Sequence, residues 1–516
     1  MKAIMGKHRT AFDILFVLTL SIAIAACGGG GSGSSTLPGT GTGTGPGTGI
    51  ATIQGSVPGT VFVAVNNDTN IETGRVTAAA TGSGTTKNFS MDLPTGATYR
   101  FYVMENDGTS NTRIYPMYMG TNNVFALDNT ADGQTISLGM INPDMGTGWA
   151  TPANNPALMM GRGADGSIPP SLAGMAFSMD DVMGTTWGYN TMMTSGTMGW
   201  EHGTLSFDNN GTHMTGVVRN GTPLPDRNNI PYTMTLSGML LNPGDSTFQC
   251  VVSRDRSVMV ATFTDGTGGP AMMIGQRRGA TFQTNGSDMD GTWKFQRFTA
   301  GNDNITSGWA YGTMGINAGF AGITSITTNN GPGTTGNFTF SMNANGIMTQ
   351  IGNASFYGVM SMDKSMIVAT DTNGGNPEIW VMMRNTTAST ADMMGDWVMH
   401  SVSSGNTDSR GWTFGHSVVD ANGDDTFSGM MGNTGPVSST QMTFQMSGGV
   451  MTMGGTSGGT GGGMGGGMMG GGTGGGMTGG GLVTSTFHGI MNGAKNLMVS
   501  AYTDGAGGYP FSIQVK

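Results

Sequence analysis

The stretch SFYGVMSMDKSMIVATDTNGGN, residues 355–376, decides the fold because related forms of it occur three times in the chain. TFQCVVSRDRSVMVATFTDGTGG begins at Thr247, and TFHGIMNGAKNLMVSAYTDGAGG begins at Thr486. Each form is an apolar run, a polar turn, a second apolar run and a turn containing Gly, which is the pattern of β-hairpins. The sequence therefore predicts three tandem copies of one β unit.

A shorter anchor lies upstream of each copy and supports the same repeat. It reads GWEHG from Gly199, GWAYG from Gly308 and GWTFG from Gly411. Its Trp either seals the core of the unit or lines a ligand cavity, since a barrel of eight strands is just filled by side chains. These tryptophans are Trp200, Trp309 and Trp412.

Each unit reads as a series of short antiparallel strands. Runs such as NFTFSM and SMIVATDT alternate or are wholly apolar, and tight turns separate them. About eight strands in ~105 residues fit an up-and-down barrel, and the alternative is a six-bladed propeller with two blades per unit. The GTW at Gly291 and the GDW at Gly395 resemble the Gly-x-Trp opening of lipocalin- and avidin-type barrels, whereas in the first copy either LAGMAF or GTTW is equivalent.

The region before the repeats reads as a separate β domain. GTVFVAVN alternates, and FSMDLPTGATYRFYV resembles the hairpins of prealbumin-like sandwiches, which implies a spacer or adhesion support. The whole chain is thus expected to be all-β. Its predicted parts are a signal peptide at 1–26, a Gly/Thr-rich tether at 27–49, a β-sandwich at 50–148, a linker at 149–170, and β units at 171–283, 284–387 and 388–516.

The N-terminus predicts export and lipidation. A basic start precedes a short apolar stretch that ends in IAAC, and this resembles the lipobox of bacterial lipoproteins. The resemblance implies cleavage before Cys27 and acylation of that residue, hence a membrane anchor. Gly28 in place of Asp implies sorting to the outer membrane, with the folded part periplasmic or surface-exposed.

Composition excludes several kinds of partner. The net charge is −10 and only 10% of residues are charged, which argues against nucleic acid and against adhesion to anionic lipid. The chain has two Cys, so lipidation of Cys27 leaves Cys250 without an intramolecular disulfide partner.

The third unit carries a Gly/Met-rich run at 454–481 that its counterparts lack. Because the rest of the unit is complete without it, the run is expected to be an inserted loop. Met replaces Leu as apolar filler elsewhere in the chain, so these Met residues need no special role. A thioether site for copper is the alternative. Its candidate ligands are Met464, Met468, Met469 and Met477.

Two histidines of the third unit extend the possible metal site. His416 follows GWTFG and His488 lies in TFHG, where the second unit has Thr313 and Tyr357. If strand order brings the imidazoles together, they can bind a metal with a nearby Met; otherwise they are ordinary strand residues.

The motifs favour binding over catalysis. A formal Gly-x-Ser-x-Gly match at Gly455 lies in the Gly-rich run, with no strand-to-helix turn around it. No cofactor is implied apart from the possible copper. We therefore expect a non-enzymatic surface binding or adhesion scaffold whose ligand is a protein or polysaccharide. The alternatives are a copper-binding envelope lipoprotein and a small-ligand carrier that uses the barrel interiors.

Overall fold

The fold is described from a computed structural model of the chain. Its described residues are 49–516 without 58–60, 79–86, 106–111, 120–122, 128–131, 145, 155–158, 164–169, 174, 280–281, 302–305, 406–409, 438–440, 454–486 and 505–507. The lipobox with Cys27, the tether and the Gly/Met-rich run with Met464, Met468, Met469 and Met477 therefore lie outside the described residues. The all-β prediction is confirmed, because strands make up nearly all of the regular structure.

The N-terminal region consists of two sheets. In the first the order is β10-β9-β1-β4, with β1 and β9 parallel, and in the second it is β11-β8-β5-β2-β3. Their facing apolar side chains, such as Phe62, Phe89 and Phe101, are buried in one cluster. The strands are β1 (Ile50–Val57), β2 (Val61–Asn66), β3 (Ile71–Thr77), β4 (Lys87–Pro94), β5 (Tyr99–Glu105), β6 (Arg113–Pro116), β7 (Tyr118–Met119), β8 (Asn123–Leu127), β9 (Thr135–Asp144), β10 (Trp149–Pro152) and β11 (Met159–Gly163).

Residues 149–170 are not simply a linker. Here β10 pairs with β9 and β11 pairs with β8, so the segment extends both sheets before the repeats begin.

The second β unit is a closed barrel of eight antiparallel strands. Its sheet order runs from β23 to β24 and β25, and an additional pairing of β23 with β24 closes it. Trp293, Phe295 and Met348 belong to the apolar cluster that fills its interior. Its elements are η2 (Gly286–Met289), β22 (Gly291–Thr299), β23 (Gly308–Asn317), β24 (Phe320–Thr328), β25 (Gly331–Pro332), β26 (Asn337–Met342), β27 (Ile347–Gln350), β28 (Asn353–Met360), β29 (Met366–Asn373) and β30 (Asn376–Arg384).

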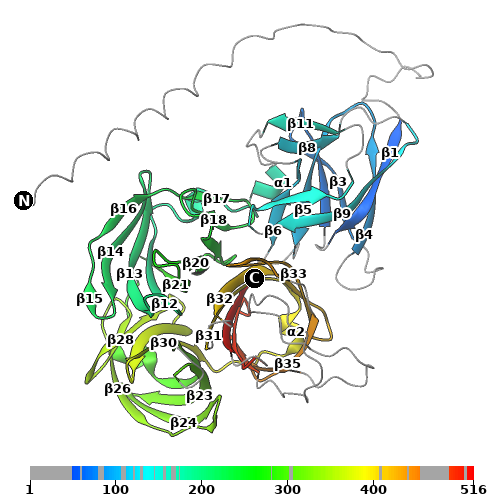
Figure 1. The fold of residues 1–516 in the computed structure, drawn as a ribbon. Helices are drawn as coiled ribbons and strands as arrows, with labels where there is room; N and C mark the ends of the chain where they lie inside the picture. The colour runs from blue at the N-terminus through cyan, green and yellow to red at the C-terminus, as the bar shows by residue number, and fades with distance from the viewer. Residues whose placement is uncertain are drawn as a thin grey trace, which may run out of the picture. The chain divides into compact units, whose positions relative to one another are not determined.

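The third unit is a second closed barrel, and Figure 1 shows it nearly end-on as a ring of strands. Pairing of β32 with β33 closes it, as in the second unit. A propeller blade does not close on itself, so the six-bladed alternative is wrong for these two units. The elements are α2 (Thr390–Met393), β31 (Gly395–Gly405), β32 (Gly411–Val419), β33 (Asp424–Gly432), β34 (Gly435–Pro436), β35 (Gln441–Ser447), β36 (Val450–Met453), β37 (His488–Met491), β38 (Leu497–Ala501) and β39 (Gly508–Val515).

The first unit has the same strand sequence, but its ten-stranded sheet has no closing pair among the described residues. The segment equivalent to β26 is divided at Pro231, and its first part pairs with β14 whereas its second part pairs with β18. Proline has no N–H for a ladder bond, which accounts for the break. The elements are α1 (Pro170–Ala173), η1 (Met179–Asp181), β12 (Thr186–Met193), β13 (Gly199–Asp208), β14 (Gly211–Arg219), β15 (Thr222–Pro223), β16 (Arg227–Ile230), β17 (Thr233–Met234), β18 (Met239–Leu241), β19 (Gln249–Val252), β20 (Val258–Thr264) and β21 (Pro270–Arg278).

An equivalent ion pair occurs in all three units. In each, an Asp of the short helix before the first long strand binds the cation at the left-handed turn of the hairpin quoted above. Trp187, Trp293 and Trp397 occupy the same register position at the start of that strand, so GTTW is the first unit's equivalent of Gly-x-Trp. The pairs are Asp181–Arg256 at 2.5 Å, Asp288–Lys364 at 2.9 Å and Asp392–Lys495 at 2.7 Å.

The last strand of each unit is buried on both faces. In β21, β30 and β39 nearly every residue is buried, because one face fills its own unit and the other packs against neighbouring units. Val260, Val381 and Ile513 belong to one shared apolar cluster that joins all three units. The outer faces of these strands are therefore part of the core between units and are not exposed to solvent. Among the described residues, no helix has the length and apolar character needed to cross a membrane.

Candidate functional site

The three anchor tryptophans lie at the contacts between neighbouring units, which are called seams below. Each donates its indole N–H to a Thr hydroxyl of another unit, and the three acceptor threonines occupy equivalent positions at or close to the end of the second strand of the hairpin quoted above. The first unit contacts the second, the second the third, and the third the first, so the contacts form a closed cycle. The bonds are Trp200–Thr372 at 2.7 Å, Trp309–Thr503 at 3.0 Å and Trp412–Thr264 at 2.9 Å.

Three buried histidines also lie at the seams, one at each. His202 stacks on Tyr357 with ring centroids 3.5 Å apart. His488 stacks on Tyr311 at 3.3 Å. His400 is hydrogen-bonded to the hydroxyl of Thr262, with 3.2 Å between Nδ1 and Oγ1.

Burial keeps these three imidazoles neutral. It lowers the pKa of His202 to about 4 and the pKa values of His400 and His488 to about 3. Gln296 adds a contact to His488, with its amide nitrogen 2.9 Å from Nδ1. The structure therefore does not bring His488 to His416, as a shared metal site requires, and places it in a contact between units.

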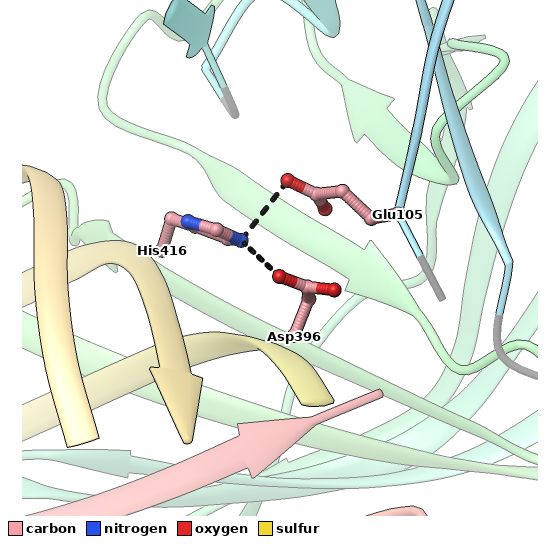
Figure 2. Close-up of side chains that lie close together, drawn as sticks. All are labelled: Glu105, Asp396 and His416. Carbon is pink, nitrogen blue, oxygen red and sulfur yellow. Dashed lines mark ion pairs between the residues drawn. The ribbon is translucent and has the colours of Figure 1, made fainter. Parts of the chain in front are cut away.

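His416 belongs to a separate buried cluster with two carboxylates, drawn in Figure 2. It projects from β32, Asp396 from β31 and Glu105 from the end of β5 in the N-terminal sheets. Its Nε2 lies 3.0 Å from Glu105 Oε1 and 3.7 Å from Asp396 Oδ1. The exposed fractions of the three side chains are 4%, 0% and 4% for His416, Glu105 and Asp396.

The electrostatics of this cluster differ from those of the seams. Burial alone would lower the pKa of His416, but the negative charge of Glu105, with that of Asp396 and Asp425, raises it to about 9. Burial raises the pKa of Asp425 to about 6 against the hydrogen bonds from Ser417 and Gln514. A cation at the His416 position, either a proton or a metal ion, is thus strongly favoured.

Two cationic side chains, Arg113 and Lys516, interact electrostatically with this cluster. Arg113 is the cross-strand neighbour of Glu105 on β6, and its guanidinium donates to the carbonyl of Ser237 at 2.5 Å. Lys516 Nζ donates to the carbonyl of Met394 at 2.8 Å. Burial lowers the pKa of Lys516 to about 8, and the negative charge of Asp396 opposes this shift. Sequence reasoning identified His416 alone, because Glu105 and Asp396 come from segments that only the folded chain brings together.

The interior of the third barrel leaves little room for a ligand. The third unit retains a cavity of about 20 Å³, room for one water molecule. Met399, Met430 and Met442 line it together with the ring of Tyr502. A small-ligand carrier needs several hundred Å³, so this interior does not fit that function.

A larger hollow of about 370 Å³ opens on the surface of the third unit. It lies beside α2 and the β35–β36 hairpin, near the residue where the Gly/Met-rich run begins. Among the residues that the structure describes, no charged side chain lines it. The lining residues are Thr390, Asn422, Gln445, Ser447 and Thr452, with Met446 and Val450.

Comparison with known proteins places the chain in no family: no family model and no curated protein matches it. Among solved structures it is similar to a DUF3598-family protein of unknown function from Nostoc punctiforme, with 12% identity over 40% of this chain and 96% of that chain and a TM-score of 0.18. It is also similar to transferrin binding protein B of Neisseria meningitidis serogroup B, with 10% identity over 64% of this chain and 76% of that chain and a TM-score of 0.20. A mutant transferrin binding protein B of Haemophilus parasuis is similar as well, with 9% identity over 86% of this chain and 83% of that chain and a TM-score of 0.21. TM-scores this low do not establish a shared overall fold.

Proposed function

We propose that this protein is a non-enzymatic binding protein of the cell envelope, anchored by acylation of Cys27. The IAAC motif behind a short apolar stretch supports the anchor, and the following Gly/Thr-rich segment supports a tether that holds the folded part away from the bilayer. The outer-membrane location follows from the same motif through Gly28.

The ligand that fits best is a neutral polysaccharide, and the hollow on the third unit carries this proposal. Hydroxyl and amide side chains line it, and such groups donate to and accept from sugar hydroxyls. Asn422, Gln445 and Thr452 are exposed and can reach a ligand. The absence of charge at this hollow, in a chain with a net charge of −10, disfavours a strongly charged ligand.

A glycan array tests this proposal with the soluble Cys27→Ser protein. We expect saturable binding to neutral oligosaccharides, and a loss of at least tenfold in Asn422→Ala and Gln445→Ala. Ser341→Ala is the matched control, because Ser341 occupies the position of Gln445 in the second unit, and each pairs with a Thr across a hairpin. Binding that is equal in all variants, or no binding to neutral glycans, contradicts the assignment. Release of shorter oligosaccharides contradicts the non-enzymatic part.

Copper binding is kept as a second candidate because of one observation. Met399, Met430 and Met442 face a single cavity in the unit that carries the Gly/Met-rich run, and three converging thioethers suit Cu(I). Cu(I) titration of the full chain and of a variant lacking 454–481 separates a site in the run from a site in the barrel. Equal weak binding by both forms and by a Met430→Leu variant contradicts this candidate.

A further inference from the structure

The His416 cluster has the donor spacing of a metal site. Metal–ligand bonds of about 2.0–2.2 Å at angles of about 90–110° put neighbouring donor atoms about 2.8–3.6 Å apart. The two distances from His416 Nε2, 3.0 Å to Glu105 and 3.7 Å to Asp396, fall within or next to this range. One donor atom from each of the three residues lies within 4.8 Å of the others.

The direction of the imidazole is the second observation. Although Nε2 is 3.0 Å from the Glu105 oxygen, it has no hydrogen-bond partner of acceptable geometry among the described residues. Figure 2 shows the reason, since the ring points between the two carboxylates and not at either of them. A metal ion located between the three side chains fits this geometry better than a single hydrogen bond from Nε2 to Glu105.

The other ring nitrogen has a hydrogen-bond partner that suits metal binding. His416 Nδ1 lies 3.2 Å from the hydroxyl of Ser428 on β33. If Nδ1–H donates to Ser428, the lone pair of Nε2 faces the carboxylates. A hydrogen bond to the second ring nitrogen is the usual support of a metal-binding histidine.

Charge supports the same reading. With neutral His416, the Glu105 and Asp396 carboxylates put two negative charges in a buried site. Arg113 and Lys516 also interact electrostatically with these carboxylates, and their side chains donate to the backbone carbonyls of Ser237 and Met394. We propose that Glu105, Asp396 and His416 bind one divalent transition-metal ion of the Zn²⁺ or Mn²⁺ class, which joins the N-terminal sheets to the third barrel.

Metal analysis of the intact protein tests this assignment. The protein is stripped with EDTA, loaded with Zn²⁺ or Mn²⁺, desalted and analysed, and a variant lacking 454–481 is treated in parallel, so that metal bound by thioethers of the Gly/Met-rich run is recognised. We expect one ion per chain and a thermal transition that rises on loading. Glu105→Gln and Asp396→Asn keep the side-chain shape and should each weaken Zn²⁺ binding at least tenfold. His213→Gln is the matched control, because His213 lies 3.0 Å from a single carboxylate, that of Asp208.

A second measurement does not depend on whether the variants fold. Co²⁺ bound to the wild-type protein should give visible absorption bands that Zn²⁺ abolishes. Substoichiometric metal in the wild type, or binding that Glu105→Gln and Asp396→Asn leave unchanged, overturns the assignment and leaves His416 as a protonated partner of Glu105. Binding of Ca²⁺ in preference to Zn²⁺ also overturns it, because Ca²⁺ selects oxygen ligands and does not need the imidazole.

Discussion

Acidification is expected to destabilise the chain through the three seam histidines, His202, His400 and His488. Their pKa values in the folded protein are about 4, about 3 and about 3, whereas each returns to about 6.5 on unfolding. Below pH 6.5 the unfolded chain therefore binds more protons than the folded chain, so stability falls as the pH falls.

The size of the effect at pH 5.0 follows from the unfolded state. At pH 5.0 the imidazoles of the folded protein remain neutral. In the unfolded chain they are protonated, because this pH is about 1.5 units below their pKa of about 6.5. Each histidine then removes about 2 kcal/mol relative to pH 7.5. Because the three lie at different seams, the losses should add to roughly 6 kcal/mol, which is comparable with the whole stability of an ordinary domain.

The chain itself supplies replacements that do not titrate in this range. Tyr311 occupies the position of His202 in the second unit, Tyr357 that of His488, and Gln296 that of His400. We therefore compare the wild type with a His202→Tyr, His400→Gln, His488→Tyr variant by urea unfolding at pH 7.5 and 5.0. The fluorescence of the buried tryptophans reports the transition.

The comparison isolates the seam histidines, because Asp425 and His416 titrate in both proteins alike. We expect the wild type to lose about 6 kcal/mol more than the triple variant between the two pH values. His213→Gln should behave as the wild type, since partial pairing with Asp208 raises the pKa of His213 instead of lowering it. Equal losses in wild type and triple variant would refute the reasoning.

Four further outcomes are expected. Thr503→Val leaves the Trp309 indole N–H without its acceptor and should cost about 1–3 kcal/mol in urea unfolding, whereas an unchanged midpoint contradicts the seam. The Cys250 thiol is buried and burial raises its pKa, so it should react with a disulfide reagent only after unfolding. Cys27→Ser should release the protein from membranes or block its processing, and normal fractionation would disprove the anchor. Deletion of 454–481 should change stability by less than about 1 kcal/mol, because loop closure depends weakly on length; a larger loss means that the run packs into the barrel.

The strand pattern predicted most of the fold. Alternation in runs such as residues 337–342 reflects strands with one face in a barrel and one in solvent, and the repeated anchors set the number of units. Closure of the first unit could not be predicted, because its outcome depends on where Pro231 falls in the ladder. The sequence contained a pattern that indicates contacts between units, but the pattern did not identify which units meet. Residues 379–383 are apolar on both faces, which indicates burial on both sides of the strand but does not show which element covers it.

The candidate site could be predicted only in fragments. His416 was identifiable as an imidazole absent from the second unit, where Thr313 occupies its place. Glu105 lies in the N-terminal sheets and Asp396 at the start of the third unit, and nothing in a single sequence indicates that they meet. The surface hollow depends on which polar side chains of neighbouring strands face the same way, and this also requires the folded chain.

The closed cycle of contacts among the three units has a genetic consequence. Three identical chains could make the same cycle as a homotrimer, but every substitution would then appear three times. Joining the copies in one polypeptide lets each unit mutate alone. The seams have accordingly diverged to His202–Tyr357, Tyr311–His488 and His400–Thr262. A long insertion can also occur once, in the third copy, where threefold repetition would have crowded three loops onto one assembly.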